Sequence, residues 1–122
     1  MGNVRIACQA ITWGDGIGNR LSEILPAMSS AGYEGAEIGF RHIQSVPAPK
    51  TKELLDENGL ELMASHVGGN LADLGQARSE QGMVEGVLDY LRVTGTRLLM
   101  YSGLRYEDDD QLSRDIAMIA SA

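Results

Sequence analysis

Two residues in this sequence stand out as groups that could transfer protons or contact a polar ligand. Glu37 lies in the run Gly35–Gly39, which otherwise contains only small and apolar residues. A carboxylate in such a run is costly unless it is paired or faces a polar cavity. His66 precedes Val67-Gly68-Gly69, where the glycines let the backbone approach a ligand, and its imidazole titrates near neutral pH. We take Glu37 and His66 as candidate catalytic residues.

Each candidate also has a structural interpretation. Glu37 could be held in an ion pair by Arg41, and His66 could be a histidine that is only hydrogen-bonded at a strand end. For His42 the structural interpretation is favoured, because its loop is not anchored. Three further polar or aromatic residues fall near predicted strand ends and are candidate substrate contacts: Trp13, Asn70 and Tyr101.

Hydrophobic patterning predicts the elements that must position these residues. Strands are expected at 4–11, 35–39, 60–65 and 97–101, and helices between them. The first run is almost continuously apolar, which predicts a strand buried on both faces. Strands that alternate with helices predict a parallel sheet with right-handed crossovers. Functional side chains gather at the carboxyl ends of such strands, and Glu37 and His66 are placed there.

Local signals predict where the helices begin and end. Asn19 is expected to cap a first helix that ends at Gly32, with Pro26 kinking or splitting it. A loop that contains Pro49 is expected before a short helix that ends near Gly59. A third helix, ended by Gly95, and a last helix each carry apolar residues on one face: Val84, Val87, Leu88 and Leu91, then Leu112, Ile116 and Ile119.

The chain length limits the architecture. A complete (βα)8 barrel needs ~250 residues, about 31 per unit, so 122 residues leave room for four units. We therefore predict an α/β fold in a single domain, residues 1–122: a (βα)4 half of a TIM barrel, with a parallel four-stranded sheet and helices on its outer face. Such an open sheet leaves both edge strands unpaired, which predicts a homo-oligomer, most simply a homodimer.

Composition excludes several classes of partner. The 17 Asp and Glu against 10 Lys and Arg give a net charge of −7, and the cations are scattered, which disfavours nucleic acid. No run approaches the ~20 apolar residues of a membrane span. Cys8 is the only cysteine, so no internal disulfide can form, and a small buried apolar role is expected for it. These features favour a cytoplasmic protein.

The segment Gly14-Asp15-Gly16-Ile17-Gly18 leaves a second fold open. It lies between a predicted strand and helix, as a dinucleotide-binding loop does, and Glu37 is at a suitable distance for a ribose contact. The third glycine is one position early, however, and Asn19 stands in its place. An ordinary loop is favoured, with a doubly wound nucleotide-binding module as the alternative. The acidic run 107–110 lacks EF-hand spacing and fits the N-terminus of a helix.

Three stretches resemble the xylose isomerase-like family of sugar phosphate isomerases/epimerases and inosose dehydratases. They are residues 6–14, residues 31–39 with their AGY-x-G-x-E phrase, and residues 64–69. The resemblance implies a TIM barrel whose full-length members bind a divalent metal (Mn, Zn, Co or Mg) and move a proton or hydride on a sugar, sugar phosphate or inositol-derived ketone. It also implies that Glu37 and His66 match pocket positions, and that the metal ligands belong to strands five to eight, which this sequence lacks.

The resemblance gives two functional interpretations besides nucleotide binding. The chain could be a half-barrel that is inactive alone and self-associates to complete a barrel. Alternatively, it could be the N-terminal half of a metal-dependent isomerase, epimerase or dehydratase that is active only with a complementary C-terminal half. For the isolated chain we expect no metal site and no cofactor, and a sugar or polyol as the ligand; whether it is an enzyme by itself stays open.

Overall fold

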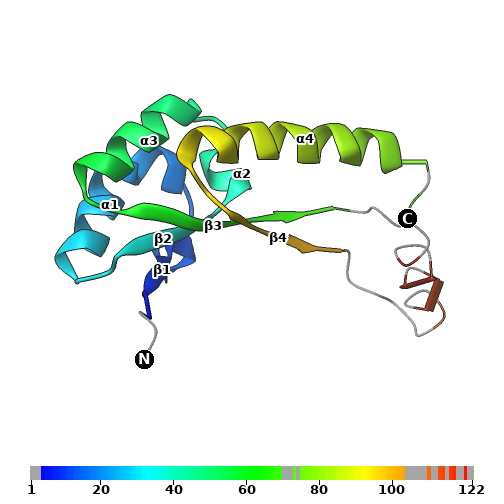
Figure 1. Ribbon diagram of the computed structural model, residues 1–122, viewed down its shortest axis with the longest axis horizontal. Coiled ribbons are helices and arrows are strands. Elements are labelled where there is room, and N and C mark those ends of the chain that lie inside the picture. Colours follow the sequence, from blue (N-terminus) through cyan, green and yellow to red (C-terminus); the bar gives the residue numbers. More distant parts are fainter. Residues whose placement is uncertain are drawn as a thin grey trace.

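The computed structural model describes residues 4–69, 73, 75–103 and the isolated positions 110, 113, 114, 116, 117 and 120. Within this part of the chain, four strands form one sheet in the order β1-β2-β3-β4, and each pair of neighbours is parallel (Figure 1). The strands are β1 (Ala7–Gln9), β2 (Gly35–Gly39), β3 (Glu61–Gly68) and β4 (Leu98–Ser102).

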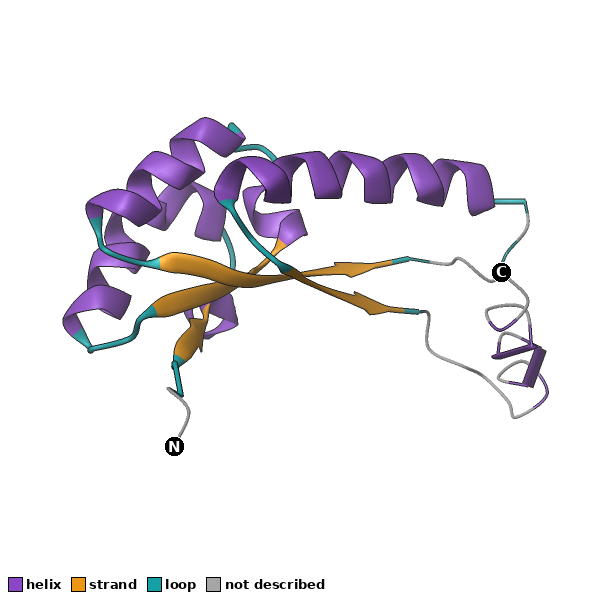
Figure 2. Ribbon diagram, in the orientation of Figure 1, coloured by secondary structure: helices purple, strands orange, loops and turns teal. Residues whose placement is uncertain are grey.

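The α-helices gather on one face of this sheet, and α4 runs alongside β3 and β4 (Figure 2). Two short 3-10 helices, η1 and η2, follow β1, and four α-helices complete the described fold. Their bounds are η1 (Ala10–Trp13), η2 (Ile17–Arg20), α1 (Leu21–Ser30), α2 (Phe40–Ile43), α3 (Ala48–Glu57) and α4 (Ala77–Thr94).

The strand order confirms the predicted α/β half-barrel and contradicts the alternative of a doubly wound fold. A doubly wound sheet reverses its strand order at a switch point, and there the dinucleotide binds. Here the order is sequential, as in a barrel. The glycine-rich segment that motivated the alternative leads into η2, and α1 begins only at Leu21.

The core lies between the sheet and the helices. Side chains of alternate strand residues, including Ala36, Ile38 and Leu62, are completely or almost completely buried on the helix-facing side. The longer helices α1, α3 and α4 each contribute buried residues in return, with Ile24 on α1 and Val87 on α4 fully buried. The face of the sheet opposite the helices becomes the inside of a barrel when a barrel closes.

Three glycines end helices as predicted. Gly32, Gly59 and Gly95 have φ values of 92°, 64° and 75°, in the left-handed region that only glycine adopts easily. The prediction for Asn19 was wrong, because residues 17–20 form η2 and α1 begins without a side-chain cap. Pro26 lies inside α1, which continues through it as a single element.

Several predicted boundaries also differ. Pro49 lies in the first turn of α3 rather than in a loop, a position that tolerates its missing N–H. The helix α2 was not predicted, because four residues offer no periodicity. The third strand extends to Gly68, beyond the predicted end at residue 65. The predicted last helix and the acidic run lie largely outside the described residues.

The first strand is much shorter than predicted and is not buried on both faces. The side chain of Gln9 accepts a hydrogen bond from the amide of Ile11 at 2.7 Å, and this turn starts η1 in place of further strand. Val4, Ile6 and Ile11 are all more than half exposed. The reason is that β1 forms an edge of the described sheet, so one flank has no neighbour.

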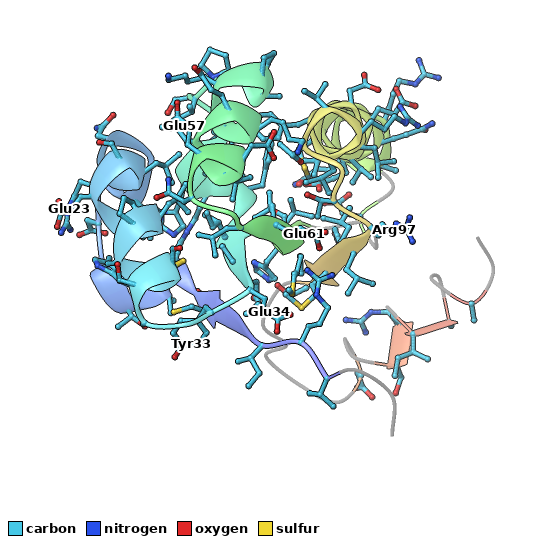
Figure 3. The ribbon with its side chains drawn as sticks, turned by 60° about the vertical axis from the view of Figure 1, so that its left-hand side comes forward. Glu23, Tyr33, Glu34, Glu57, Glu61 and Arg97 are labelled. Atoms are coloured by element: carbon cyan, nitrogen blue, oxygen red, sulfur yellow. The ribbon has the colours of Figure 1, made fainter. Side chains whose placement is uncertain are left out.

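The amino ends of the strands carry an ion-pair cluster (Figure 3). The Arg5 guanidinium contacts Glu34 at 3.1 Å and Glu61 at 2.7 Å, so it joins the chain before β1 to the turn before β2 and the start of β3. Its hydrogen bonds to Glu61 and then Glu34 raise the pKa of Arg5 further. A barrel keeps its chemistry at the opposite end, so we assign this cluster to stability.

Candidate functional site

A cavity of about 830 Å³ opens at the carboxyl ends of the strands. All four strands, α2 and the first half of α4 contribute to its wall. It therefore lies where parallel α/β folds place their chemistry. Its lining residues are Gln9, Ile11, Glu37, Gly39, Phe40, Arg41, His42, Gln44, His66, Val67, Gly68, Glu80, Met83 and Met100.

Glu37 enters the cavity from β2 and is held by Gln9 on β1. The two residues are register partners, and Gln9 Nε2 donates to Glu37 Oε1 at 3.3 Å. Gln9 is itself oriented, because its Oε1 atom accepts the Ile11 amide. The ion pair with Arg41 that we considered from the sequence is not formed; the Arg41 Nε donates to His42 instead. The carboxylate thus faces the cavity with a neutral amide as its neighbour.

His66 enters the same cavity from β3. It is the register partner of Gly39 on β2 and of Met100 on β4, and its Nε2 atom lies 2.8 Å from the Ser102 hydroxyl oxygen. Glu37 pairs with Ala64, two residues before His66, so the two candidates share a sheet face on adjacent strands. A strand spacing of ~4.8 Å and a rise of ~3.3 Å per residue put their Cα atoms about 8 Å apart. That separation can bracket one sugar ring or short polyol.

The helix α2 forms a second wall. It begins directly after Gly39, so the chain turns from β2 into the cavity rim with Arg41, His42 and Gln44. Arg41 Nε lies 3.2 Å from His42 Nε2, which must therefore be the unprotonated acceptor nitrogen in this arrangement. His42 thus lines the site, although the sequence favoured a purely structural role for it.

Glu80 closes the cavity from α4. Its Oε2 atom is buried and makes no hydrogen bond among the described atoms. It fits against Gly69, where a Cβ atom would lie only 2.1 Å from that oxygen. Sequence reasoning could not find Glu80, because its place depends on how far α4 extends over β3. Gln9 could have been found, since a polar residue at the end of an apolar strand is the same signal that identified Glu37.

Two of the three predicted substrate contacts, Trp13 and Tyr101, are not part of this wall. Trp13 ends η1, is partly buried and packs against the core. Tyr101 is the register partner of Val67, which is buried on the helix-facing side, and its hydroxyl oxygen lies near Gly69. Neither lines the cavity. Asn70 lies outside the described residues.

The described residues do not fit a complete metal site. No group of three or more His, Cys, Asp or Glu side chains comes together in this part of the chain. Glu37 and His66 provide two oxygen or nitrogen ligands, and a stable divalent site needs more. Among the helices described, none is long and apolar enough to cross a bilayer.

Comparison with known proteins identifies the fold. No protein-family model and no curated protein matches the sequence. A sugar phosphate isomerase/epimerase from Parabacteroides distasonis superposes with a TM-score of 0.73 at 17% identity, over 99% of this chain and 45% of that one. A xylose isomerase-like TIM barrel/4-hydroxyphenylpyruvate dioxygenase fusion protein gives a TM-score of 0.70 at 14% identity, over 91% of this chain and 18% of that one.

These likenesses establish the class of fold: the chain has the fold of half of a TIM barrel. The predicted half-barrel fold is confirmed, and so is the structural similarity to barrels of the kind that the sequence resembles. The chain spans less than half of the length of either protein.

Proposed function

We propose that this chain provides the N-terminal half of a sugar-binding barrel mouth, related to sugar phosphate isomerases and epimerases, and that it is inactive until a second half closes the sheet. The observation that supports this proposal is the convergence of Gln9, Glu37 and His66, from three successive strands, on one cavity at the carboxyl end of the sheet. Their donors and acceptors suit the hydroxyl and carbonyl groups of a sugar, cyclitol or related polyol.

The proposed division of roles follows from the chemistry of each side chain. Glu37, as a carboxylate, accepts hydrogen bonds from ligand hydroxyls and can take up a proton. His66 can accept or donate near neutral pH, and its bond to Ser102 holds the ring in one orientation. Isomerisation also needs groups that stabilise the charge developing on the substrate carbonyl. Glu37 and His66 do not provide these stabilising groups. We therefore propose that the second half of the barrel supplies them.

A second copy of the chain is the partner we favour, and the site is incomplete without it. Both sheet edges carry exposed apolar side chains, with Ile6 beside β1 61% exposed and Leu98 on β4 62% exposed. A twofold axis along the barrel would place β4 of each copy parallel to β1 of the other and close eight strands. Glu37 and His66 of both copies would then face one mouth. A complementary C-terminal half is the alternative partner, and would meet the same two edges.

The proposal is tested by titrating the protein with a ketose, an inosose and a ketose phosphate while the two histidine rings are followed by NMR. We expect the His66 signals to respond to at least one of these ligands. Glu37→Gln, followed on the His66 ring, and His66→Ala, followed on the His42 ring at the same cavity, should each weaken binding by about tenfold or more, equivalent to 1.4 kcal/mol. Glu53→Gln is the matched control, because Glu53 pairs with Lys50 on α3, away from the cavity.

Two results would count against the proposal. One is the absence of any response at His66 to all three ligands, both for the chain alone and after mixing with a C-terminal half-barrel. The other is binding that Glu37→Gln and His66→Ala leave at the wild-type level. Turnover by the isolated, chelator-treated chain would instead contradict the statement that it is inactive alone.

A further inference from the structure

The helix α2, which forms one wall of the cavity, is too short to be stable in its position without contacts from other elements. A helix of four residues gains little from its internal hydrogen bonds, so neighbouring elements must place it. Two such neighbours lie directly against the backbone of α2 or the turn after it. One is Tyr90 on α4, and the other is Gly18 on η2.

The Tyr90 hydroxyl is a junction between three elements. It lies 2.9 Å from the Val46 carbonyl oxygen and 3.1 Å from that of Ile43, and it donates its one hydrogen to this pair. Thr51 on α3, which is fully buried, lies 2.6 Å away and donates to the tyrosine oxygen in return. The Tyr90 ring also packs edge-on against Phe40, with centroids 5.3 Å apart. Both ends of α2 are thereby tied to α4.

Gly18 lets η2 pack closely against the backbone of α2. A Cβ atom on Gly18 would lie 2.2 Å from the carbonyl oxygen of His42, a distance that no real side chain tolerates. Only glycine lets η2 approach the backbone of α2 this closely. The third glycine of the glycine-rich segment, considered earlier for nucleotide binding, therefore has a different explanation: it makes room for the cavity wall.

We infer that Tyr90 and Gly18 are positioning residues for the cavity, and that they act through α2 to place Arg41 and His42 at its rim. Neither residue lines the cavity itself. The inference concerns the wall of the site proposed above for a sugar, but the placement of α2 can be measured without any ligand. A failure of the proposed function therefore stays distinguishable from a failure of this inference.

The experiment compares Tyr90→Phe and Gly18→Ala with the wild type by backbone and histidine NMR at neutral pH. Tyr90→Phe keeps the ring and removes only the hydroxyl. We expect both variants to shift the amides of residues 40–44 and the ring signals of His42, and to leave the ring of His66 unchanged. Hydrogen exchange at the Val46 amide, which bonds to the Ile43 carbonyl, should become about tenfold faster in Tyr90→Phe.

Gly82→Ala is the matched control for the glycine variant, since a Cβ atom there has nothing within 4 Å. Its shifts should stay within α4. Changes in Tyr90→Phe that are confined to residues near Tyr90 on α4, with α2 and His42 as in the wild type, would overturn the inference. The same holds if Gly18→Ala perturbs only η2. If Gly18→Ala does not fold, Tyr90→Phe decides the question alone.

Discussion

The Nε2 atom of His66 lies 2.8 Å from the Oγ atom of Ser102, although 36 residues separate them in the chain. The register explains this contact, because Ser102 is opposite Gly68 and lies diagonally from His66 on the same sheet face. Since Gly68 has no side chain, Ser102 can lean back toward the histidine. The pair fixes one ring nitrogen of His66, and the rest of the ring borders the cavity.

The first prediction concerns this pair. Ser102→Ala should change the ring nitrogen shifts of His66 and leave those of His42 at their wild-type values, because only His66 loses a partner. The loss of global stability should be small, since the pair is exposed to solvent. Histidine-selective NMR together with a urea unfolding curve tests both statements. Identical His66 shifts in the variant would show that the hydrogen bond does not form in solution.

The second prediction concerns stability at alkaline pH. Burial raises the pKa of Tyr90 above its ordinary value near 10, and the hydrogen bond from Thr51 opposes this only in part. The folded protein therefore binds this proton more tightly than the unfolded chain does. The resulting stabilisation is fully present below pH ~10 and is lost as the pH rises through the raised pKa of the folded state.

Tyr90→Phe carries no titrating group at this position, so its free energy of unfolding should fall less steeply above pH ~10 than that of the wild type. At neutral pH it should be less stable, because the buried Thr51 hydroxyl and the Ile43 and Val46 carbonyls each lose one hydrogen bond, at a cost of about 1–3 kcal/mol. Tyr33→Phe, at the surface, is the control and should keep the wild-type slope. Parallel pH profiles for Tyr90→Phe and the wild type would contradict this.

The third prediction concerns the amino ends of the strands. Arg5→Met leaves the carboxylates of Glu34 and Glu61 without their shared cation, so the melting temperature should fall at low ionic strength. These side chains are about half exposed, and salt should therefore reduce the difference; at about 1 M salt the screening length is only ~3 Å. Arg92→Met, which breaks a pair within α4, should have a smaller effect. A difference that does not depend on salt would exclude an electrostatic origin.

Much of this fold could be predicted from the sequence, because it depends on local patterns. The run Gly35–Gly39 is the strand that was predicted, and glycines 32, 59 and 95 end helices through their own backbone preference. The first strand was overestimated for a different reason. Its apolar residues suit a strand buried on both sides, but the end of β1 is decided by a single side-chain contact, from Gln9 to the Ile11 amide.

The candidate site was predictable only where the signal was a polar residue at the end of an apolar strand. This rule identified Glu37 and His66, and both line the cavity. It failed for Tyr101, because successive side chains of a strand point to opposite faces of the sheet. Met100 lines the cavity, and the next residue, Tyr101, therefore points toward the helices. The contributions of Glu80, Tyr90 and Gly18 depend on contacts between elements far apart in the chain. No local sequence pattern predicts these contacts.

The fourth prediction concerns the open edge of β4. Leu98→Asp should leave the fold of a single chain intact, since Leu98 is 62% exposed, but it should prevent any partner strand from packing there. Val93→Asp on α4 is the control, with a side chain that is 47% exposed on the helical layer rather than on the sheet. Circular dichroism reports the fold and sedimentation velocity reports association. Equal association of the two variants would remove β4 from the interface.

The most direct test of the half-barrel account is the mass of the purified chain in solution, measured by light scattering across the micromolar range. The account predicts a particle of twice the 13.1 kDa chain mass, reduced to the single chain mass by Leu98→Asp and unchanged by Val93→Asp. A compact, stable monomer throughout this range would contradict the proposal that a second copy closes the sheet.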